Sequence, residues 1–177
     1  MAMETVKLRA VHKADLGWLL EHLKTENADG IRQWAGNTLR HPIDAEQLRR
    51  HHARLNNGLT DCRGYVAEAG PQRTGYVELF NIKKRGSAFI TRMLVLPAFR
   101  NQGVGAAMLR QLLKLGFEQL QLHRIELNVY NFNSAAIRCY EKVGFQKEGL
   151  LRGITFTGRD YWDAYRMAIL EDEWRGR

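Results

Sequence analysis

The residues best suited to chemistry lie in one short stretch, which begins at Arg100 and holds two glycines, Gly103 and Gly105. Glycine lacks a Cβ, so the backbone there can adopt a positive φ and leave room for phosphate oxygens, while Arg100 adds charge and forked donors. A helical pattern follows, and the first N–H groups of a helix have no partner within it. This order predicts a pyrophosphate site formed by Arg100, Asn101, Gln102, Gly103, Val104, Gly105 and Ala106.

Two common nucleotide-binding patterns fit this stretch poorly. A P-loop needs Lys and then Ser or Thr after its last glycine, whereas Gly105 is followed by Ala106 and Ala107. The dinucleotide fingerprint needs a third glycine, and this chain has Met108 at that position. The sequence therefore predicts neither a nucleotide triphosphatase nor a dinucleotide-dependent enzyme.

A second stretch, residues 131–145, predicts another helix that carries polar groups. Asn133 suits its N-terminus, and Gly144 suits a left-handed cap at its end. Helical spacing places Tyr140 on the same side as Ala136, and the phenol of a tyrosine can donate a hydrogen bond. The pattern therefore predicts a capped helix with Tyr140 and Ala136 on one side.

The two stretches together resemble a known family. Arg100-x-x-Gly103-x-Gly105-Ala106 after an apolar strand resembles the coenzyme A loop of the GNAT superfamily, the acetyl-CoA-dependent N-acetyltransferases. The run from Asn131 to Phe145 resembles the second signature of that family, with its Asn, Ala, Tyr and Gly-Phe, and it follows in the same order. The resemblance implies that acetyl-CoA is the co-substrate and that the strands on either side of the loop and its helix part to admit the pantetheine arm.

The resemblance also implies roles for single residues. Tyr140 would donate the proton to the leaving thiolate, and Asn133 would hydrogen-bond the pantetheine arm. The remaining cofactor contacts would come from the same motif and from the backbone of the strand before the loop, at Lys142, Met93, Leu94 and Val95. Cys139 could form an acyl-enzyme, but a helical Cys among apolar neighbours is usually inert, so we expect direct attack in a ternary complex.

The general base and the acceptor contacts are less well marked. Glu78 lies on a predicted central strand, where partial burial would raise its pKa and suit it to act as the base, and a chain of waters is an equal alternative. Trp34 is a candidate substrate contact, although a structural role explains it as well. Among His41, His51 and His52 there is no metal-ligand spacing, and the sequence shows no acidic partner for them.

The acceptor is expected to be a primary amine. Residues 75–79 and 161–167 look most like the branch with ribosomal-protein N-terminal and spermidine acetyltransferases. A protein or peptide N-terminus and a small amine both remain open. The net charge of +8 would repel a polyamine unless a local acidic pocket exists.

The elements that must position these residues follow from the periodicity. We expect an α/β (α+β) fold, with a mixed, mostly antiparallel sheet and helices on both faces. Asp15 and Asp44 are expected to begin two helices, residues 25–37 to form a loop, and the helix after the glycines to end near residue 120. The strands are expected at residues 6–10, 63–69, 74–82, 88–96, 124–129, 145–151 and 161–169.

Composition limits the class of protein. The chain has 177 residues, 45% hydrophobic and 26% charged, which predicts one soluble domain over residues 1–177. The two cysteines lie far apart, and no apolar run has the length of a signal peptide or a membrane span, so we expect a cytoplasmic protein.

The distribution of charge leaves two alternatives to an enzyme. No acidic residue lies between Glu78 and Glu118, a stretch that includes the predicted phosphate loop and would attract coenzyme A. Such a basic surface is also compatible with a nucleic-acid-binding domain, although no recognition pattern is clear, or with a coenzyme A-binding regulator that has lost catalysis. The C-terminal strand could pair across a two-fold axis in a homodimer.

Overall fold

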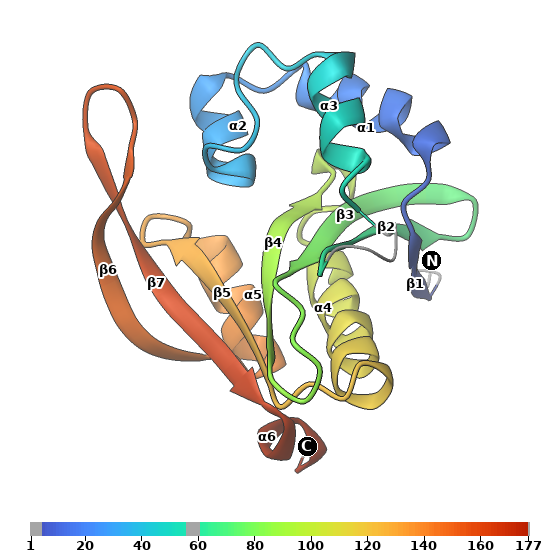
Figure 1. Cartoon of the computed structure of the whole chain (residues 1–177), viewed down its shortest axis with the longest axis vertical. Helices are drawn as coiled ribbons and strands as arrows, with labels where there is room; N and C mark the ends of the chain where they lie inside the picture. The colour runs from blue at the N-terminus through green and yellow to red at the C-terminus, as the bar shows by residue number, and fades with distance from the viewer. Residues whose placement is uncertain (1–4, 56–60, 177) are drawn as a thin grey trace.

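The structure is a computed structural model and describes residues 5–55 and 61–176. Its centre is a seven-stranded sheet in the order β1-β2-β3-β4-β5-β7-β6, with β4 and β5 parallel and every other neighbouring pair antiparallel (Figure 1). The strands are β1 (Val6–Ala10), β2 (Arg63–Ala69), β3 (Gln72–Phe80), β4 (Ser87–Val95), β5 (Arg124–Tyr130), β6 (Gln146–Phe156) and β7 (Tyr161–Leu170). The mixed, mostly antiparallel sheet predicted from the sequence is confirmed.

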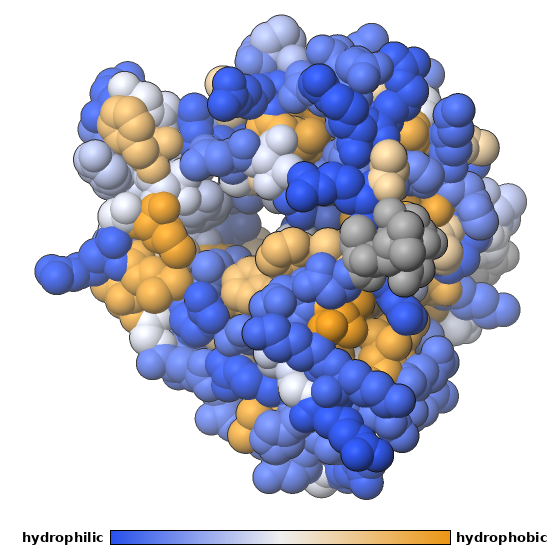
Figure 2. Space-filling model, viewed as in Figure 1, coloured by the Kyte–Doolittle hydropathy of each residue, from blue (hydrophilic) through white to orange (hydrophobic). Residues whose placement is uncertain are grey.

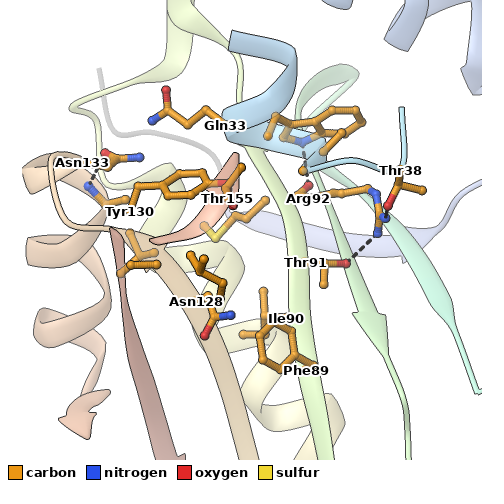
Figure 3. A pocket seen from close by; sticks show the side chains of 18 of the residues that line it. Gln33, Thr38, Phe89, Ile90, Thr91, Arg92, Asn128, Tyr130, Asn133 and Thr155 are labelled. Atoms are coloured by element: carbon orange, nitrogen blue, oxygen red, sulfur yellow. Dashed lines mark hydrogen bonds between the residues drawn. The ribbon is translucent and has the colours of Figure 1, made fainter. Parts of the chain in front are cut away.

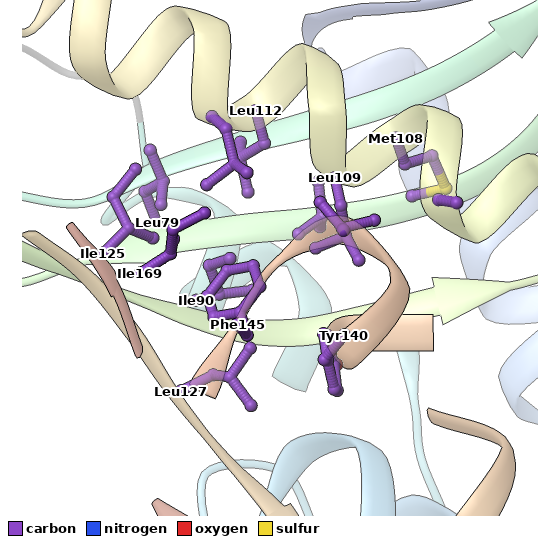
Figure 4. Packing of buried hydrophobic residues seen from close by; sticks show 14 of the residues in the cluster. Leu79, Ile90, Met108, Leu109, Leu112, Ile125, Leu127, Tyr140, Phe145 and Ile169 are labelled. Carbon is purple, nitrogen blue, oxygen red and sulfur yellow. The ribbon is translucent and has the colours of Figure 1, made fainter. Parts of the chain in front are cut away.

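Helices cover both faces of this sheet. They are α1 (Leu16–Leu23), α2 (Ala28–Ala35), α3 (Ala45–His52), α4 (Val104–Lys114), α5 (Ser134–Val143) and the short α6 (Glu171–Arg175). One face buries the apolar sides of α4 and α5 in a core that includes Leu79, Ile90, Leu109 and Phe145 (Figure 4). The other face buries α1, α2 and α3 in a second core around Leu23, Ile31 and Leu48.

The strands β4 and β5 part in the middle of the sheet. Among the described residues they pair only from Ser87 to Ile90 on β4, after which β5 continues alongside β7. A bulge lies at the point of parting, because Tyr76 pairs with Leu94 and Glu78 with Thr91, so that two residues of β4 face one of β3. One of those two is Arg92, which has a positive φ of 49°. The splay implied by the resemblance is therefore present.

Several local predictions are confirmed by the caps. The Asp44 side chain accepts from the backbone N–H of Gln47, and the Asn133 side chain accepts from that of Ala136. Gly144 ends α5 with a φ of 115°. In the described part of the chain, no helix has the length and apolar character needed to cross a bilayer.

Other local predictions are wrong, for identifiable reasons. Residues 28–35 form α2 and not a loop, because Asn27 caps a helix through the N–H of Gly30 and Ile31 is buried beneath it. Asp15 does not cap α1, since its carboxylate turns back to the N–H of His12 and to Arg9. The helix predicted to end near residue 120 does reach Gln119, although as α4 to Lys114 followed by a single π-helical turn, Leu115–Gln119.

Candidate active site

A cavity of about 320 Å³ opens where β4 and β5 part. Its walls come from the end of α2 and the loop after it, the middle of β4, the end of β5, the start of α5 and the β6–β7 hairpin (Figure 3). The space-filling view shows the molecule hollowed there, between the hairpin and the α2 helix (Figure 2). Of the residues predicted from the sequence, Trp34, Met93, Asn133 and Tyr140 line this cavity.

The phosphate loop leads into α4 through backbone geometry. Gly103 has a φ of 82° and stands at the N-cap without a side-chain cap, and its carbonyl accepts the first helical hydrogen bond, from Ala107. The N–H groups of Val104, Gly105 and Ala106 precede that bond, so they are available to an anion. The side chains of Val104 and Ala106 are buried in the core, so only their backbones can serve a ligand.

The two glycines of the loop have different roles. Gly103 needs its left-handed conformation, whereas Gly105 lies within the helix at an ordinary φ. A Cβ on Gly105 would lie 3.3 Å from the Sγ atom of Cys139 and 3.5 Å from a methyl carbon of Val95. The absence of a side chain at Gly105 therefore allows α4 to pack closely against α5 and β4.

Arg100 and its neighbours brace the loop. The Nε atom of Arg100 donates to the Val95 carbonyl at 3.0 Å, and among the described residues its two terminal nitrogens have no partner. The Gln102 amide donates to the Ala98 carbonyl at 2.7 Å, and Asn101 has a φ of 60°. Lys142 lies exposed on α5, near enough to Cys139 for its charge to favour the thiolate. These contacts leave the Arg100 fork free to meet a phosphate.

Tyr140 lies at the inner end of the cavity. Its side chain is 9% exposed, and its hydroxyl lies 3.8 Å from the Met93 sulfur. Burial raises the pKa of Tyr140 above its usual value of 10, so the phenol stays protonated at neutral pH. A protonated phenol at this position can donate a hydrogen bond or a proton.

Trp34 and Asn133 form part of the cavity wall and also hold structure together. The indole Nε1 of Trp34 donates to the Arg92 carbonyl at 2.8 Å, which fixes the bulge of β4 to α2. The Trp34 ring also packs against Tyr76, with ring centroids 5.9 Å apart. Asn133 caps α5 while it faces the cavity. Both residues therefore combine the structural and the ligand-facing positions that the sequence left open.

Glu78 lies behind the cavity in a network of buried polar groups. It is 2% exposed, and Oε2 accepts from Arg92 at 2.7 Å. Oε1 accepts from the Tyr76 hydroxyl at 2.7 Å and lies 2.7 Å from Nε2 of His51. Arg92 also donates to the hydroxyls of Thr38, at 2.6 Å, and Thr91, at 2.9 Å. The network joins β3 and β4 to the α2–α3 region.

This network corrects two expectations. Burial by itself would raise the pKa of Glu78, but the hydrogen bond from His51 and the charge of Arg92 outweigh it and lower the pKa below the usual 4.5. The expected raised pKa is therefore wrong. His51 has an acidic partner after all, which the sequence could not show because 27 positions separate it from Glu78.

Cys139 is poorly suited to nucleophilic attack. Burial raises the pKa of its thiol, and it is not among the described residues that line the cavity. In the described chain, no group of three or more His, Cys, Asp or Glu side chains is arranged to hold a metal ion.

Splayed strands, free backbone N–H groups at the start of α4 and a protonated phenol nearby are the features expected of a transferase that binds an acyl thioester. The family model of the Acetyltransferase (GNAT) family matches residues 28–145. The chain therefore belongs to the GNAT family and is an N-acetyltransferase whose co-substrate is acetyl-CoA.

Three relatives illustrate the likeness. A crystal structure of spermidine N-acetyltransferase from Vibrio cholerae, in complex with CoA and spermine, superposes with a TM-score of 0.83 at 26% identity and covers 97% of this chain and 98% of that one. Spermidine N(1)-acetyltransferase of Escherichia coli (strain K12) is 26% identical over 96% of this chain and 88% of its own length. The L-amino acid N-acetyltransferase AaaT of the same strain is 37% identical over 85% of this chain and 96% of its own length.

The sequence pointed to Trp34 and Glu78 but not to the side chains that hold them in place. Arg92, Thr38 and His51 join Glu78 in one network, and none of them was predicted to be functional. One signal was available, because Arg92 is the only charged residue in the nine residues of β4. A charge within an otherwise apolar and neutral strand is costly unless it is paired, and it therefore marks a site.

Proposed function

We propose that the protein transfers the acetyl group of acetyl-CoA to a primary amine by direct attack in a ternary complex. The observation that carries this proposal is the position of Tyr140, a buried phenol beside the edge of β4 that β5 leaves free. Cys139, the alternative nucleophile in this region, is held as a thiol by burial, which favours direct attack over an acyl-enzyme.

Each step of the transfer has a residue to support it. The backbone of Met93, Leu94 and Val95 would align the pantetheine arm, and an N–H of Leu94 or Val95 would polarise the thioester carbonyl. Tyr140 would give its proton to the thiolate as the tetrahedral adduct collapses. The phosphates would be held by Arg100, Asn101, Gln102, Gly103, Val104, Gly105 and Ala106. Asn133, at the start of α5, would hydrogen-bond the pantetheine arm, and Lys142, in the last turn of α5, would add a further contact to the cofactor.

For Glu78 we propose a positioning role in place of the base predicted from the sequence. Its carboxylate faces Arg92, His51 and Tyr76, and it is not among the described residues that line the cavity. A carboxylate with a lowered pKa is also a weak base. The attacking amine would then lose its proton to water in the cavity, which was the alternative left open.

The acceptor and the assembly state belong to the proposal as well. The relatives act on spermidine or on L-amino acids, and a protein N-terminus remains a third candidate, with Trp34 as a wall for any of them. Self-association through the C-terminal strand needs revision, because β7 is flanked by β5 and β6. The sheet ends at β1 and at β6, and β6 is the edge strand next to β7, so we propose pairing there; the Vibrio cholerae spermidine enzyme has a dodecameric structure.

Thiol release from acetyl-CoA, measured with a panel of amines, tests the proposal. With a working amine, Tyr140→Phe should lower kcat roughly a hundredfold, because it removes the proton donor. Calorimetry should show an unchanged Kd for coenzyme A, because the phenol contributes to chemistry and not to binding of the phosphates. Equal turnover in the variant would remove Tyr140 from the mechanism, and no affinity for coenzyme A would overturn the whole proposal.

A further inference from the structure

The cavity carries almost no charge of its own. Among the described residues that line it, Arg92 alone is charged, and there is no Asp or Glu. The polar groups of the lining are amides and hydroxyls, including Gln33, Asn37 and Asn128. An ammonium group beyond the one that reacts would therefore find no carboxylate with which to pair.

The nearest candidate for such a carboxylate, Glu78, is not available. Its two oxygens are engaged by Arg92, Tyr76 and His51, and only 2% of the residue is exposed. Arg92 is among the residues that line the cavity and Glu78 is not, so only the cationic partner of this ion pair belongs to the cavity wall. A second cation at this wall would meet a residue of like charge and, among the described lining residues, no carboxylate.

The Arg92 guanidinium is held in place. It donates to Thr38 and Thr91 (Figure 3) and to Glu78, and its backbone carbonyl in the bulge accepts from Trp34. A charge that is fixed by four neighbours cannot swing away to admit a cation, and turning it would leave Glu78 buried without its partner. The fold therefore fixes the sign of the electrostatic potential at the Arg92 wall of the cavity.

From these observations we propose that the acceptor is a primary amine without a second positive charge, and that a carboxylate close to the amine favours binding. An apolar α-amino acid is the simplest molecule of this class, because Phe89, Ile90 and Ile154 give the cavity apolar walls. This inference rests on the proposed function and adds the class of its acceptor. The favourable charge of Arg92 raises affinity and the rate of encounter for an anionic group and lowers both for a cation.

A matched set of acceptors tests the class. Leucine, leucinamide and spermidine are compared by thiol release from acetyl-CoA at the same pH and ionic strength. We expect kcat/KM to fall in that order, roughly tenfold or more from leucine to spermidine, and the gap to narrow at high salt. The amide lowers the pKa of the neighbouring amine and leaves more free base, so this chemical bias works against the expected order.

A single substitution should reverse the preference. Gln33 lines the cavity, is exposed and lies at its upper wall in Figure 3, so Gln33→Glu adds a carboxylate of nearly the same shape. It should raise kcat/KM for spermidine about fivefold and lower that for leucine by a similar factor, as expected for one charge at short range. Gln119→Glu makes the same change on the exposed π-helical turn and should alter neither value.

The possible outcomes distinguish a failure of the proposed acceptor class from a failure of the proposed acetyltransferase function. The inference would be overturned if spermidine were turned over as well as leucine. It would also be overturned if the Gln33→Glu variant bound coenzyme A normally but kept the wild-type acceptor preference. Either result would leave the proposed transferase activity intact. Turnover of none of these amines or of the wider panel would overturn the proposed function, and the acceptor class with it.

Discussion

The two sides of the proposed active site use different kinds of chemical group, mainly backbone groups on the cofactor side and side chains on the acceptor side. On the cofactor side, the groups that can meet acetyl-CoA are mostly backbone: the free edge of β4, the left-handed Gly103 and the first amides of α4. On the proposed acceptor side, a network of side chains supports the wall, in which Arg92 donates to Glu78, Thr38 and Thr91 and its carbonyl accepts from Trp34.

This difference suits the two ligands. A cofactor that never changes can be bound by main-chain geometry, which tolerates many side chains as long as the glycines and the bulge remain. An acceptor that varies between relatives needs selection by charge and shape, and those properties belong to side chains. Changes on the acceptor side should therefore alter acceptor KM, whereas changes on the cofactor side should alter the Kd for coenzyme A.

The largest effect is expected from Arg92→Met. It removes the cation beside a carboxylate that is 2% exposed, and an uncompensated buried charge costs about 3–5 kcal/mol. Urea unfolding should show this loss at pH 7, and acceptor KM should rise more than the Kd for coenzyme A. The double variant Arg92→Met with Glu78→Gln removes both charges and should recover much of the stability. No recovery would mean that the ion pair is not the source of the loss.

Gly75→Ala is the matching change on the cofactor side. Gly75 pairs with Val95 at the end of β4, and a Cβ there would lie 2.5 Å from the Leu94 carbonyl oxygen and 2.8 Å from the Met108 sulfur. Because backbone must move, we expect a loss of about 2–3 kcal/mol and a weaker Kd for coenzyme A at unchanged acceptor KM. Gly149→Ala is the control, since a Cβ on Gly149 meets nothing within 4 Å. Equal behaviour of the two variants would break the comparison.

The sequence revealed the cofactor side far better than the acceptor side, and the reason is physical. Gly103, Asn133 and Gly144 act through local backbone rules, namely a left-handed turn, a helix cap and a helix stop, so their neighbours in the sequence suffice to identify them. The contact between His51 and Glu78 depends on how α3 packs over β3, and nothing in the local sequence determines that. The same holds for α2, whose polar pattern resembled a loop until its buried face was known.

Even on the cofactor side, the sequence did not always predict why a particular residue type is needed. Gly105 was expected to make room for phosphate, but the close contact that it permits is with Cys139 and Val95. Both explanations require a glycine at that position, and only the packing of α5 against α4 distinguishes them. A sequence motif therefore predicts which residue is required more reliably than it predicts the interaction that requires it.

Acid should destabilise the fold through Asp15. This residue is 2% exposed and joins β1 to the start of α1 through Arg9. Burial alone would raise its pKa, but the hydrogen bonds from Arg9 and His12 outweigh it and lower the pKa to about 2, below the usual 3.8. The stabilisation is therefore complete above about pH 4 and is lost as the pH falls towards 2.

Asp15→Asn isolates this contribution. The variant should lose about 2 kcal/mol at pH 7, and its free energy of unfolding should fall less steeply than that of the wild type between pH 4 and pH 2. Urea unfolding at a series of pH values measures both quantities. Parallel pH profiles for the two proteins would show that other carboxylates, such as Glu78, cause the acid sensitivity.

The smallest and most specific effect is expected from Trp34→Phe. The phenyl ring can still pack against Tyr76, but it cannot donate to the Arg92 carbonyl, which Nε1 of the indole reaches at 2.8 Å. Removing one such hydrogen bond costs about 1 kcal/mol. We expect this cost to appear as a severalfold rise in acceptor KM, with the Kd for coenzyme A unchanged. Trp18→Phe makes the same change on α1, outside the cavity, and should leave KM unaltered. If Trp34→Phe instead weakened coenzyme A binding, the bulge would serve both ligands, and the division between the two sides of the site would have to be abandoned.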